Sequence, residues 1–257
     1  MTTGSHCVAV AAPIATLFAE PRVASAPISQ LLAGRIVEVL EQREDWYRVR
    51  GPDEYEGWMH RGYILPLADD GAAPPAETAR ISLGCVTTTR EGARRQLPLG
   101  AFLAADERVA TGDVIEASEQ HARFPSDAHA ITGSAQHFFE GSSYIWGGVT
   151  PWGCDCSGLV QSTFWLHGTQ LRRDAWQQAQ QGSAGEDDLM DARAADLLFF
   201  SDRVDQHITH VAISLGDGAL VHLALGRGGY AVERLDDARD PYVRKLHERF
   251  VTARRIL

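Results

Sequence analysis

The chain has 257 residues, which is enough for two or three domains, and 44% hydrophobic with 23% charged residues is an ordinary globular composition. The net charge of −10 argues against binding to nucleic acid or to anionic membranes, because both need a basic face. No apolar run is long enough to predict a membrane span.

The N-terminus is unlike an export signal. Residues 7–18 are mostly apolar, but no lysine or arginine precedes Arg22, and Pro13 interrupts the run. The four cysteines are Cys7, Cys85, Cys154 and Cys156, and the last two are too close together for a ready-made disulfide framework. We therefore expect mature sequence in a reduced compartment, the cytoplasm, with the periplasm as the less favoured alternative.

Residues 1–67 have the pattern of a small all-β domain. Short β-branched and aromatic runs are separated by turn residues, which predicts strands at 15–18, 34–40, 46–50 and 57–60. The Leu32-Ala-Gly34 step, the Asp45-Trp46-Tyr47 corner and the Tyr55-Glu-Gly-Trp58 segment resemble a bacterial SH3 domain. We predict one SH3-like barrel here.

A second all-β region follows a linker. Residues 68–79 are rich in proline, alanine and acid, which is typical of an exposed linker. In residues 80–127 the strand candidates are 79–83, 85–89, 96–99 and 108–111, with glycines between them. By analogy with relatives that carry two such modules in tandem, we predict a second SH3-like domain.

The residues that suggest chemistry lie in 128–257. After a helix that starts near Ala128, the glycine-rich segment 144–155 leads to Cys156, and apolar residues spaced three and four apart predict a helix to Leu166. A helix N-terminus favours a thiolate, so Cys156 is the candidate nucleophile. Gly147, Gly148 and Gly153 are expected to let the backbone approach a substrate closely. The alternative is a cysteine that only fills the core.

Two histidines lie in a predicted hairpin. Strands at 209–216 and 219–225 surround Gly216-Asp217-Gly218, and a three-residue loop would place His210 and His222 on the same face. A cysteine with a histidine oriented by a third polar group is the usual activated thiol. His207, in a polar loop, is the rival base. A zinc site with Cys154 and Cys156 is disfavoured, because paired cysteine ligands usually have two to four residues between them.

The motifs together resemble the NlpC/P60 family of papain-like cysteine peptidases that cut bacterial cell-wall peptides. The matching segments, in order, are Tyr144-Ile-Trp-Gly-Gly148, Asp155-Cys-Ser-Gly-Leu159, Arg173-Asp174, Asp196-Leu-Leu-Phe-Phe200, His210-Val-Ala-Ile213 and His222. The resemblance covers roughly residues 130–257. It departs from the family pattern at Ala195, where glycine is usual, and in the triplet Cys154-Asp155-Cys156.

The resemblance implies an α+β papain-like catalytic domain, residues 128–257, preceded by two small all-β SH3-like barrels. It implies that Cys156 attacks an amide carbonyl, that His210 is the general base and acid, and that His222 orients His210. The backbone N–H of Cys156 and the Tyr144 side chain would meet the oxyanion. Substrate-binding residues would be Tyr144, Trp146, Asp155, Ser157 and Asp174 and, from the first SH3-like domain, Glu20 and Tyr55. Asp174 is equally well interpreted as the cap of a helix at 175–181.

We therefore expect a cysteine endopeptidase that hydrolyses the γ-D-Glu–diamino acid bond of L-Ala-γ-D-Glu-diamino acid peptides with a free N-terminal L-Ala, in cell-wall recycling. We expect no cofactor, no metal, no nucleic acid and no membrane partner. Two alternatives are a non-catalytic wall-binding protein, which would have lost the thiol or a histidine, and a thiol-dependent acyltransferase, which would need an apolar access surface.

Overall fold

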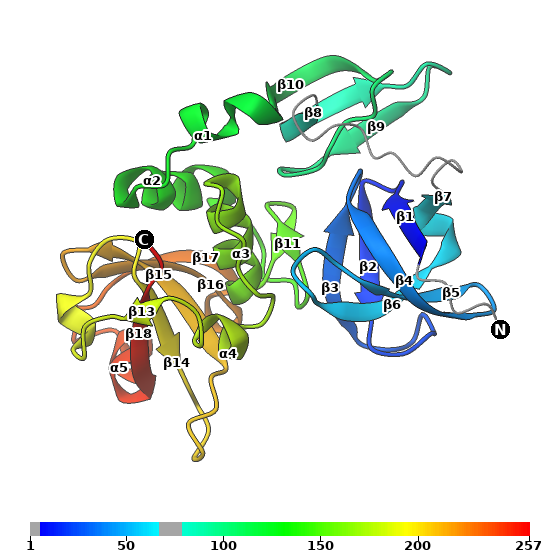
Figure 1. Ribbon diagram of the computed structural model, residues 1–257. Coiled ribbons are helices and arrows are strands. Elements are labelled where there is room, and N and C mark those ends of the chain that lie inside the picture. The colour runs from blue at the N-terminus through cyan, green and yellow to red at the C-terminus, as the bar shows by residue number, and fades with distance from the viewer. Residues whose placement is uncertain (1–5, 67–78) are drawn as a thin grey trace. The chain divides into compact units, whose positions relative to one another are not determined.

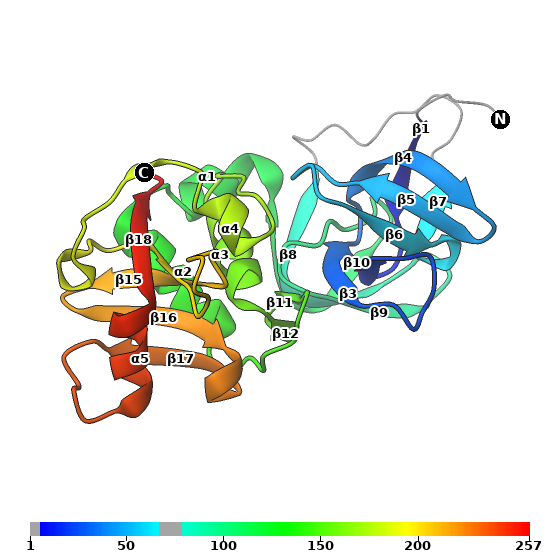
Figure 2. The same cartoon turned by 90° about the horizontal axis from the view of Figure 1, so that it is seen from below.

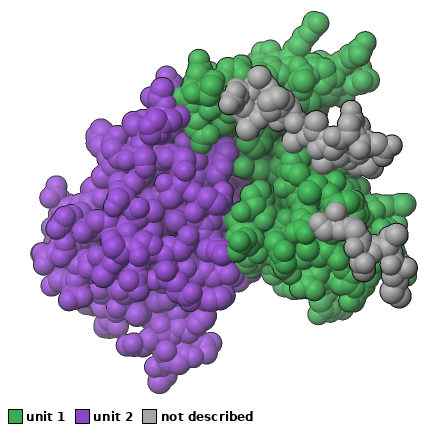
Figure 3. Space-filling view, in the orientation of Figure 1, with its two compact units in different colours: residues 1–120 green, residues 121–257 purple. Residues whose placement is uncertain are grey.

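The computed structural model describes residues 6–66 and 79–257, which belong to two compact units, 1–120 and 121–257 (Figure 3). Each unit is described by itself. Among the described residues, no helix is both long and apolar enough to cross a membrane.

The N-terminal unit begins with a seven-stranded antiparallel sheet in the order β3-β2-β6-β5-β4-β1-β7 (Figure 1). Alternate residues of its strands bury a core that includes Leu17, Val37, Val49 and Met59. The four strands predicted from the sequence are present, while the first, third and seventh were not predicted. The strands are β1 His6–Val10, β2 Ile14–Phe18, β3 Pro27–Leu32, β4 Ile36–Arg43, β5 Trp46–Arg50, β6 Glu56–His60 and β7 Ile64–Pro66, with η1 Arg61–Tyr63 between the last two.

The same unit continues with a three-stranded sheet of β8 Arg80–Thr88, β9 Arg94–Leu97 and β10 Arg108–Glu116 in the order β10-β8-β9, followed by η3 Ala117–Glu119. The sequence predicted two strands split at Gly84, but β8 runs through it. Gly84 and Gly112 both have positive φ, and a Cβ on Gly112 would lie 2.3 Å from the carbonyl oxygen of Gly84. The glycines therefore form an irregularity inside a strand pair and do not end a strand. The predicted linker, residues 68–79, lies outside the described residues apart from Ala79. The second SH3-like domain stays a prediction.

The C-terminal unit consists of helices on a six-stranded sheet in the order β13-β18-β14-β15-β16-β17 (Figures 1 and 2). Helices α2 and α3 pack on β15, whereas Leu246 of α5 packs on Phe200, Ala212 and Leu220. Helix α5 and the neighbouring strand β17 were not predicted. The helices are α1 Gln120–Arg123, α2 Ala128–Phe139, α3 Cys156–Leu166, α4 Ala175–Gln178 and α5 Pro241–Arg249, with η4 Leu189–Asp191 and η5 Leu225–Arg227. The strands are β13 Ser183–Ala184, β14 Leu197–Phe200, β15 His210–Gly216, β16 Ala219–Ala224, β17 Gly229–Arg234 and β18 Phe250–Arg255, and β11 Val149–Thr150 pairs separately with β12 Gly153–Cys154.

The hairpin that carries both histidines differs from the prediction at its tip. Gly216 pairs with Ala219, so the loop has two residues, and both Asp217 (φ 50) and Gly218 (φ 66) have the positive φ of a type I′ turn. A bulge at Leu215 then restores the predicted register, in which Ser214 faces Leu220. The predicted loop length was wrong, but the bulge keeps the two histidines on the same face.

Candidate active site

The nucleophile candidate opens a buried helix, as predicted. Cys156 is the first residue of α3 and is 6% exposed, and the side chain of Asp155 caps the helix by accepting from the N–H of Gly158. The helix ends at Leu166, and Gly168 follows with φ 81. A backbone hydrogen bond joins the thiol to Val211, the residue after His210. Helix α3 and strand β15 therefore bring the nucleophile and the first histidine to the same place.

A buried ion pair holds the cap in position. Nη2 of Arg173 lies 2.7 Å from Oδ2 of Asp155, and both side chains are almost completely buried, at 1% and 7% exposure. Oδ2 of Asp155 also accepts from the N–H of Gly147, at 2.8 Å, and Ser157 donates to Oδ1 and accepts from Arg173. Burial alone would lower the pKa of Arg173, but the charge and the hydrogen bond of Asp155, together with the nearby Cys154 and Asp174, raise that pKa overall. This pair ties the glycine-rich segment to the start of α3.

The glycines of that segment have a different use from the one predicted. A Cβ on Gly148 would lie 2.3 Å from the carbonyl oxygen of Gly153, and one on Gly158 would lie 2.1 Å from that of Gly148. These contacts are between backbone segments of the protein. Gly148 and Gly158 therefore let the β11–β12 turn pack on itself and on the first turn of α3, which begins at Cys156.

The two histidines form a hydrogen-bonded line with a glutamate that the sequence did not suggest. Nε2 of His210 lies 2.9 Å from Nδ1 of His222, which is fully buried, and Nε2 of His222 lies 3.4 Å from Oε1 of Glu233. Arg227 holds both oxygens of Glu233, at 2.7 and 2.8 Å, and also pairs with Asp240. Burial acts to raise the pKa of Glu233, but the hydrogen bonds and charges of His222 and Arg227 together lower it.

The hydrogen bonds among Glu233, His222 and His210 determine which ring nitrogens carry a hydrogen. An ionised carboxylate only accepts, so Nε2 of His222 carries a hydrogen and its Nδ1 is left as an acceptor. Nδ1 of His222 therefore accepts from Nε2–H of His210, and Nδ1 of His210 keeps a free lone pair. The arrangement prepares a neutral imidazole with Nδ1 as the basic atom.

Burial disfavours the charged forms of both reacting groups. It raises the pKa of the Cys156 thiol to about 12, with the nearby Asp155 charge acting in the same direction and hydrogen bonding to Val211 against it. Burial, followed by His222 and then Arg249, lowers the pKa of His210 well below its usual value. Desolvation therefore opposes the thiolate that was predicted from the helix N-terminus alone. Both directions favour a thiol and a neutral imidazole at rest.

The other predicted site residues of this unit differ in burial and in their partners. Tyr144 is half-buried, and burial together with Cys156 raises the pKa of its phenol, so the hydroxyl remains a donor. Trp146 is 64% exposed, and Asp174 forms the predicted cap on α4 with Gln177. Asp155 and Ser157 were predicted to bind substrate, yet both are buried, and their polar atoms bind Arg173 and each other.

His207 is not brought to the histidine pair. It is exposed in the loop before β15, and its ring lies 6.1 Å from that of Trp176. In the N-terminal unit, Glu20 is exposed and ion-paired with Arg22 at 2.8 Å, and Tyr55 packs on the barrel core. Their predicted contact with substrate stays a prediction. Within residues 6–66 and 79–257, no group of three or more histidines, cysteines or acids is arranged to hold a metal ion.

Comparison with known proteins identifies the family. The profile of the NlpC/P60 family matches residues 141–252, and that of the bacterial SH3 domain matches residues 15–64. A probable endopeptidase of Haemophilus influenzae is 33% identical over 114 residues, which cover 44% of this chain and 69% of that protein. The chain belongs to the NlpC/P60 family. As predicted, it is a cysteine endopeptidase of mixed α and β structure with an N-terminal SH3 domain.

Two longer matches extend beyond the NlpC/P60 domain. The gamma-D-glutamyl-L-lysine dipeptidyl-peptidase of Bacillus subtilis is 28% identical over 216 residues, covering 76% of this chain and 71% of that protein. The crystal structure of an NlpC/P60 family protein from Bacillus cereus superposes with a TM-score of 0.80 over 98% of this chain and 100% of that one, at 19% identity. The fold is thus shared over nearly the whole chain, SH3 region included.

Proposed function

We propose that this NlpC/P60 peptidase hydrolyses the amide bond between γ-D-glutamate and a diamino acid in cell-wall peptides whose N-terminal L-alanine is free. The observation that carries the chemistry is the line from Glu233 through His222 to His210, which leaves a basic nitrogen on the residue next to Val211, whose backbone hydrogen-bonds the buried thiol. The substrate assignment is supported by similarity to a dipeptidyl-peptidase named for the γ-D-glutamyl-L-lysine bond.

The reaction follows from the resting protonation states. Nδ1 of His210 takes the thiol proton as Sγ of Cys156 attacks the carbonyl carbon, so the charges that burial disfavours arise only with substrate in place. The backbone N–H of Cys156, at the first turn of α3, and the phenol of Tyr144 stabilise the oxyanion. The carbon–nitrogen bond then breaks as His210 returns the proton to the leaving amine. Water hydrolyses the thioester, with His210 again moving the proton, and restores the thiol.

The test uses L-Ala-γ-D-Glu-L-Lys, its diaminopimelate counterpart and the N-acetyl form of each, with products identified by mass. Cleavage into L-Ala-D-Glu and the free diamino acid is expected only from the peptides with a free amine. Cys156→Ala should abolish it, and His210→Ala should lower the rate at least about a hundredfold. His207→Ala is the matched control and should retain the wild-type rate. Equal turnover of the acetylated peptides would refute the requirement for a free amine.

The requirement for a free amine also indicates which wall peptides the enzyme would use in the cell. Released wall peptides have such an amine, whereas stems attached to glycan do not, so we assign the enzyme to the recycling of fragments. Intact sacculi should therefore yield no product under conditions in which the free peptide is fully cleaved.

A further inference from the structure

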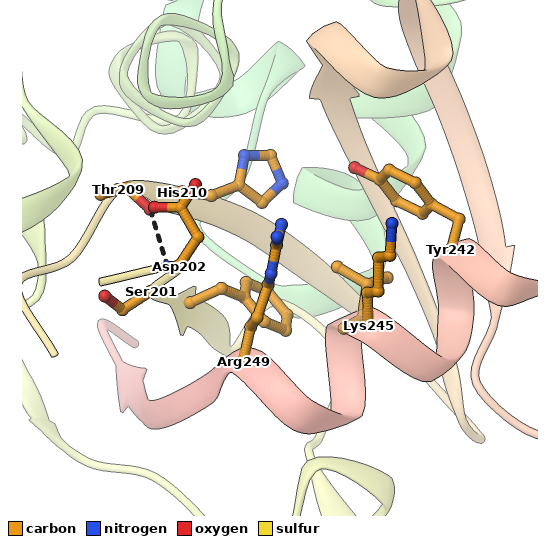
Figure 4. A pocket seen from close by; sticks show the side chains of 9 residues that line it. Ser201, Asp202, Thr209, His210, Tyr242, Lys245 and Arg249 are labelled. Atoms are coloured by element: carbon orange, nitrogen blue, oxygen red, sulfur yellow. Dashed lines mark hydrogen bonds between the residues drawn. The ribbon is translucent and has the colours of Figure 1, made fainter. Parts of the chain in front are cut away.

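A small pocket adjoins the proposed base on the side of α5. It has a volume of about 50 Å³ and lies between the end of β14, the start of β15 and α5 (Figure 4). His210 forms part of its wall. Its lining residues are Phe200, Ser201, Asp202, Thr209, His210, Tyr242, Lys245, Leu246 and Arg249. The volume suits a group of three or four heavy atoms, such as a carboxylate.

The charge of the pocket is positive although the chain is acidic. Lys245 and Arg249 project from one face of α5 toward His210, and Lys245 is the only lysine of a chain with net charge −10 (Figure 4). Among the described residues, neither side chain has an acidic partner within ion-pair distance, whereas Arg227 and Arg255 of the same unit do. The one acid in the lining, Asp202, accepts a hydrogen bond from Thr209 at 3.0 Å. Two cations against one carboxylate leave an excess of positive charge.

The position of the pocket shows which part of a peptide would reach it. The acyl half of the substrate becomes attached to Cys156, while His210 gives its proton to the nitrogen of the leaving half. We take the pocket, whose wall includes His210, to receive atoms close to that nitrogen. In a free diamino acid leaving group, the carbon bonded to the nitrogen carries a carboxylate.

We propose that Lys245 and Arg249 bind a carboxylate of the leaving residue and so select peptides that end at the diamino acid. This inference rests on the proposed function. It adds two residues outside the catalytic line that determine specificity. Both lie on α5, one turn apart, so one carboxylate can accept from both.

The same contact would assist the chemistry. Arg249 is one of the groups that hold the pKa of His210 down, because a nearby positive charge disfavours the imidazolium. A carboxylate bound to Arg249 offsets that charge. Transfer of the thiol proton to His210 then becomes easier when the correct leaving group is present.

The carboxylate has two possible sources, the α-carboxylate or the side-chain carboxylate of diaminopimelate, and three substrates separate them. These are L-Ala-γ-D-Glu-L-Lys, its C-terminal amide, and the C-terminal α-amide of the diaminopimelate peptide. We expect kcat/KM to fall about tenfold or more from the lysine acid to its amide, the change expected for a charge-assisted hydrogen bond. Retention of activity by the diaminopimelate amide would identify the side-chain carboxylate as a second source.

The variants are Lys245→Gln, Arg249→Gln and the double variant, with Arg244→Gln as the control. Arg244 is also exposed on α5, but its side chain donates to the carbonyls of Ala238 and Arg239 and does not line the pocket. The double variant should lose most of the preference for acid over amide, measured as the ratio of kcat/KM for the two lysine peptides. The control should keep the preference.

The outcomes separate this inference from the proposed function. No cleavage of any of the three peptides by the wild type refutes the proposed function. Cleavage with equal rates on acid and amide refutes only the carboxylate pocket. Variants that lose acid and amide turnover equally also refute it, because the two cations would then support His210 without recognising the leaving group.

Discussion

One arginine–carboxylate pair supports the nucleophile and another supports the two histidines, and the pairs differ in burial and in the groups they bind. Asp155 and Arg173, behind the nucleophile, are 7% and 1% exposed, whereas Glu233 and Arg227, behind the histidines, are 6% and 30% exposed. The first pair contacts mainly backbone and fixes the start of a helix. The second pair contacts the imidazole of His222 and fixes the hydrogen on its Nε2. The nucleophile is thus positioned through the main chain and the base through a hydrogen-bond relay.

The largest effect should come from breaking the buried pair. Arg173→Leu leaves the carboxylate of Asp155 buried without its partner, which typically costs about 3–5 kcal/mol of unfolding free energy. We expect a large drop in the denaturant midpoint of the catalytic unit, followed by its loss of activity. The control is Arg203→Leu, which removes an exposed pair with Asp205 in the same unit and should leave the midpoint unchanged. A wild-type midpoint for Arg173→Leu would show that the pair does not stabilise the fold.

A double variant separates the effect of the Asp155 charge from that of Arg173 packing. Asp155→Asn combined with Arg173→Leu removes the uncompensated charge while the amide oxygen can still cap α3. The double variant should regain part of the stability that Arg173→Leu loses. No recovery would mean that the loss comes from the packing of Arg173 and not from the charge of Asp155.

The relay should respond to Glu233→Gln with a change of activity and little change of stability. An amide can donate as well as accept, so Nε2–H of His222 is no longer enforced and part of the population has the wrong tautomer. We expect kcat to fall about tenfold to a hundredfold, the scale of one hydrogen bond to a charged group. KM should change less than kcat, and Glu233→Asp should recover part of the rate. An equal loss of melting temperature in both variants would indicate a purely structural role.

The pH profile tests the protonation states. His210 must be neutral to accept the thiol proton, and its pKa is lowered, so the rate should stay level through neutral pH and fall only well below pH ~6.5, the usual histidine value. Since the pKa of the Cys156 thiol is raised to about 12, its ionisation should produce no basic limb below that pH. A bell-shaped profile centred near neutrality would instead indicate a resting thiolate–imidazolium pair.

The smallest effect should follow Arg227→Gln. This arginine is partly exposed, and water can replace some of its bonds to Glu233, which keeps its contact with His222. A few-fold loss of kcat with an unchanged pH profile is expected. A loss as large as that of Glu233→Gln would show that Arg227, and not the glutamate, determines the proton position.

The nucleophile side of this comparison and the histidine pair were predictable from sequence, but the glutamate that ends the relay was not. Cys156, Asp155 and the helix to Leu166 lie within one short segment, where spacing and capping preferences apply directly. Glu233 reaches His222 only because β17 pairs with β16 so that Ala231 faces His222, which makes Glu233 the diagonal neighbour on the same face. That register depends on the turn between the two strands, and we could not predict this turn from the sequence.

Helix α5 shows a signal that was present and missed. Asp240 followed by Pro241 is a strong start for a helix, and the Asp240 side chain does accept from the N–H of Tyr242. The helix after it is amphipathic, but it is polar overall and short, and only Val243 and Leu246 of its apolar side are buried. The pocket with Lys245 and Arg249 therefore had no counterpart in the sequence-based expectations.

Because of the bulge at Leu215, a change in the length of this turn can impair catalysis without altering any catalytic residue. Side chains alternate across a strand, so the two-residue turn and the extra residue beside it together set the phase between His210 and His222. Deleting Leu215, or inserting one residue at Asp217, would leave every catalytic residue in the sequence and still turn one histidine to the wrong side. Family members should therefore tolerate changes of composition in this turn far better than changes of length.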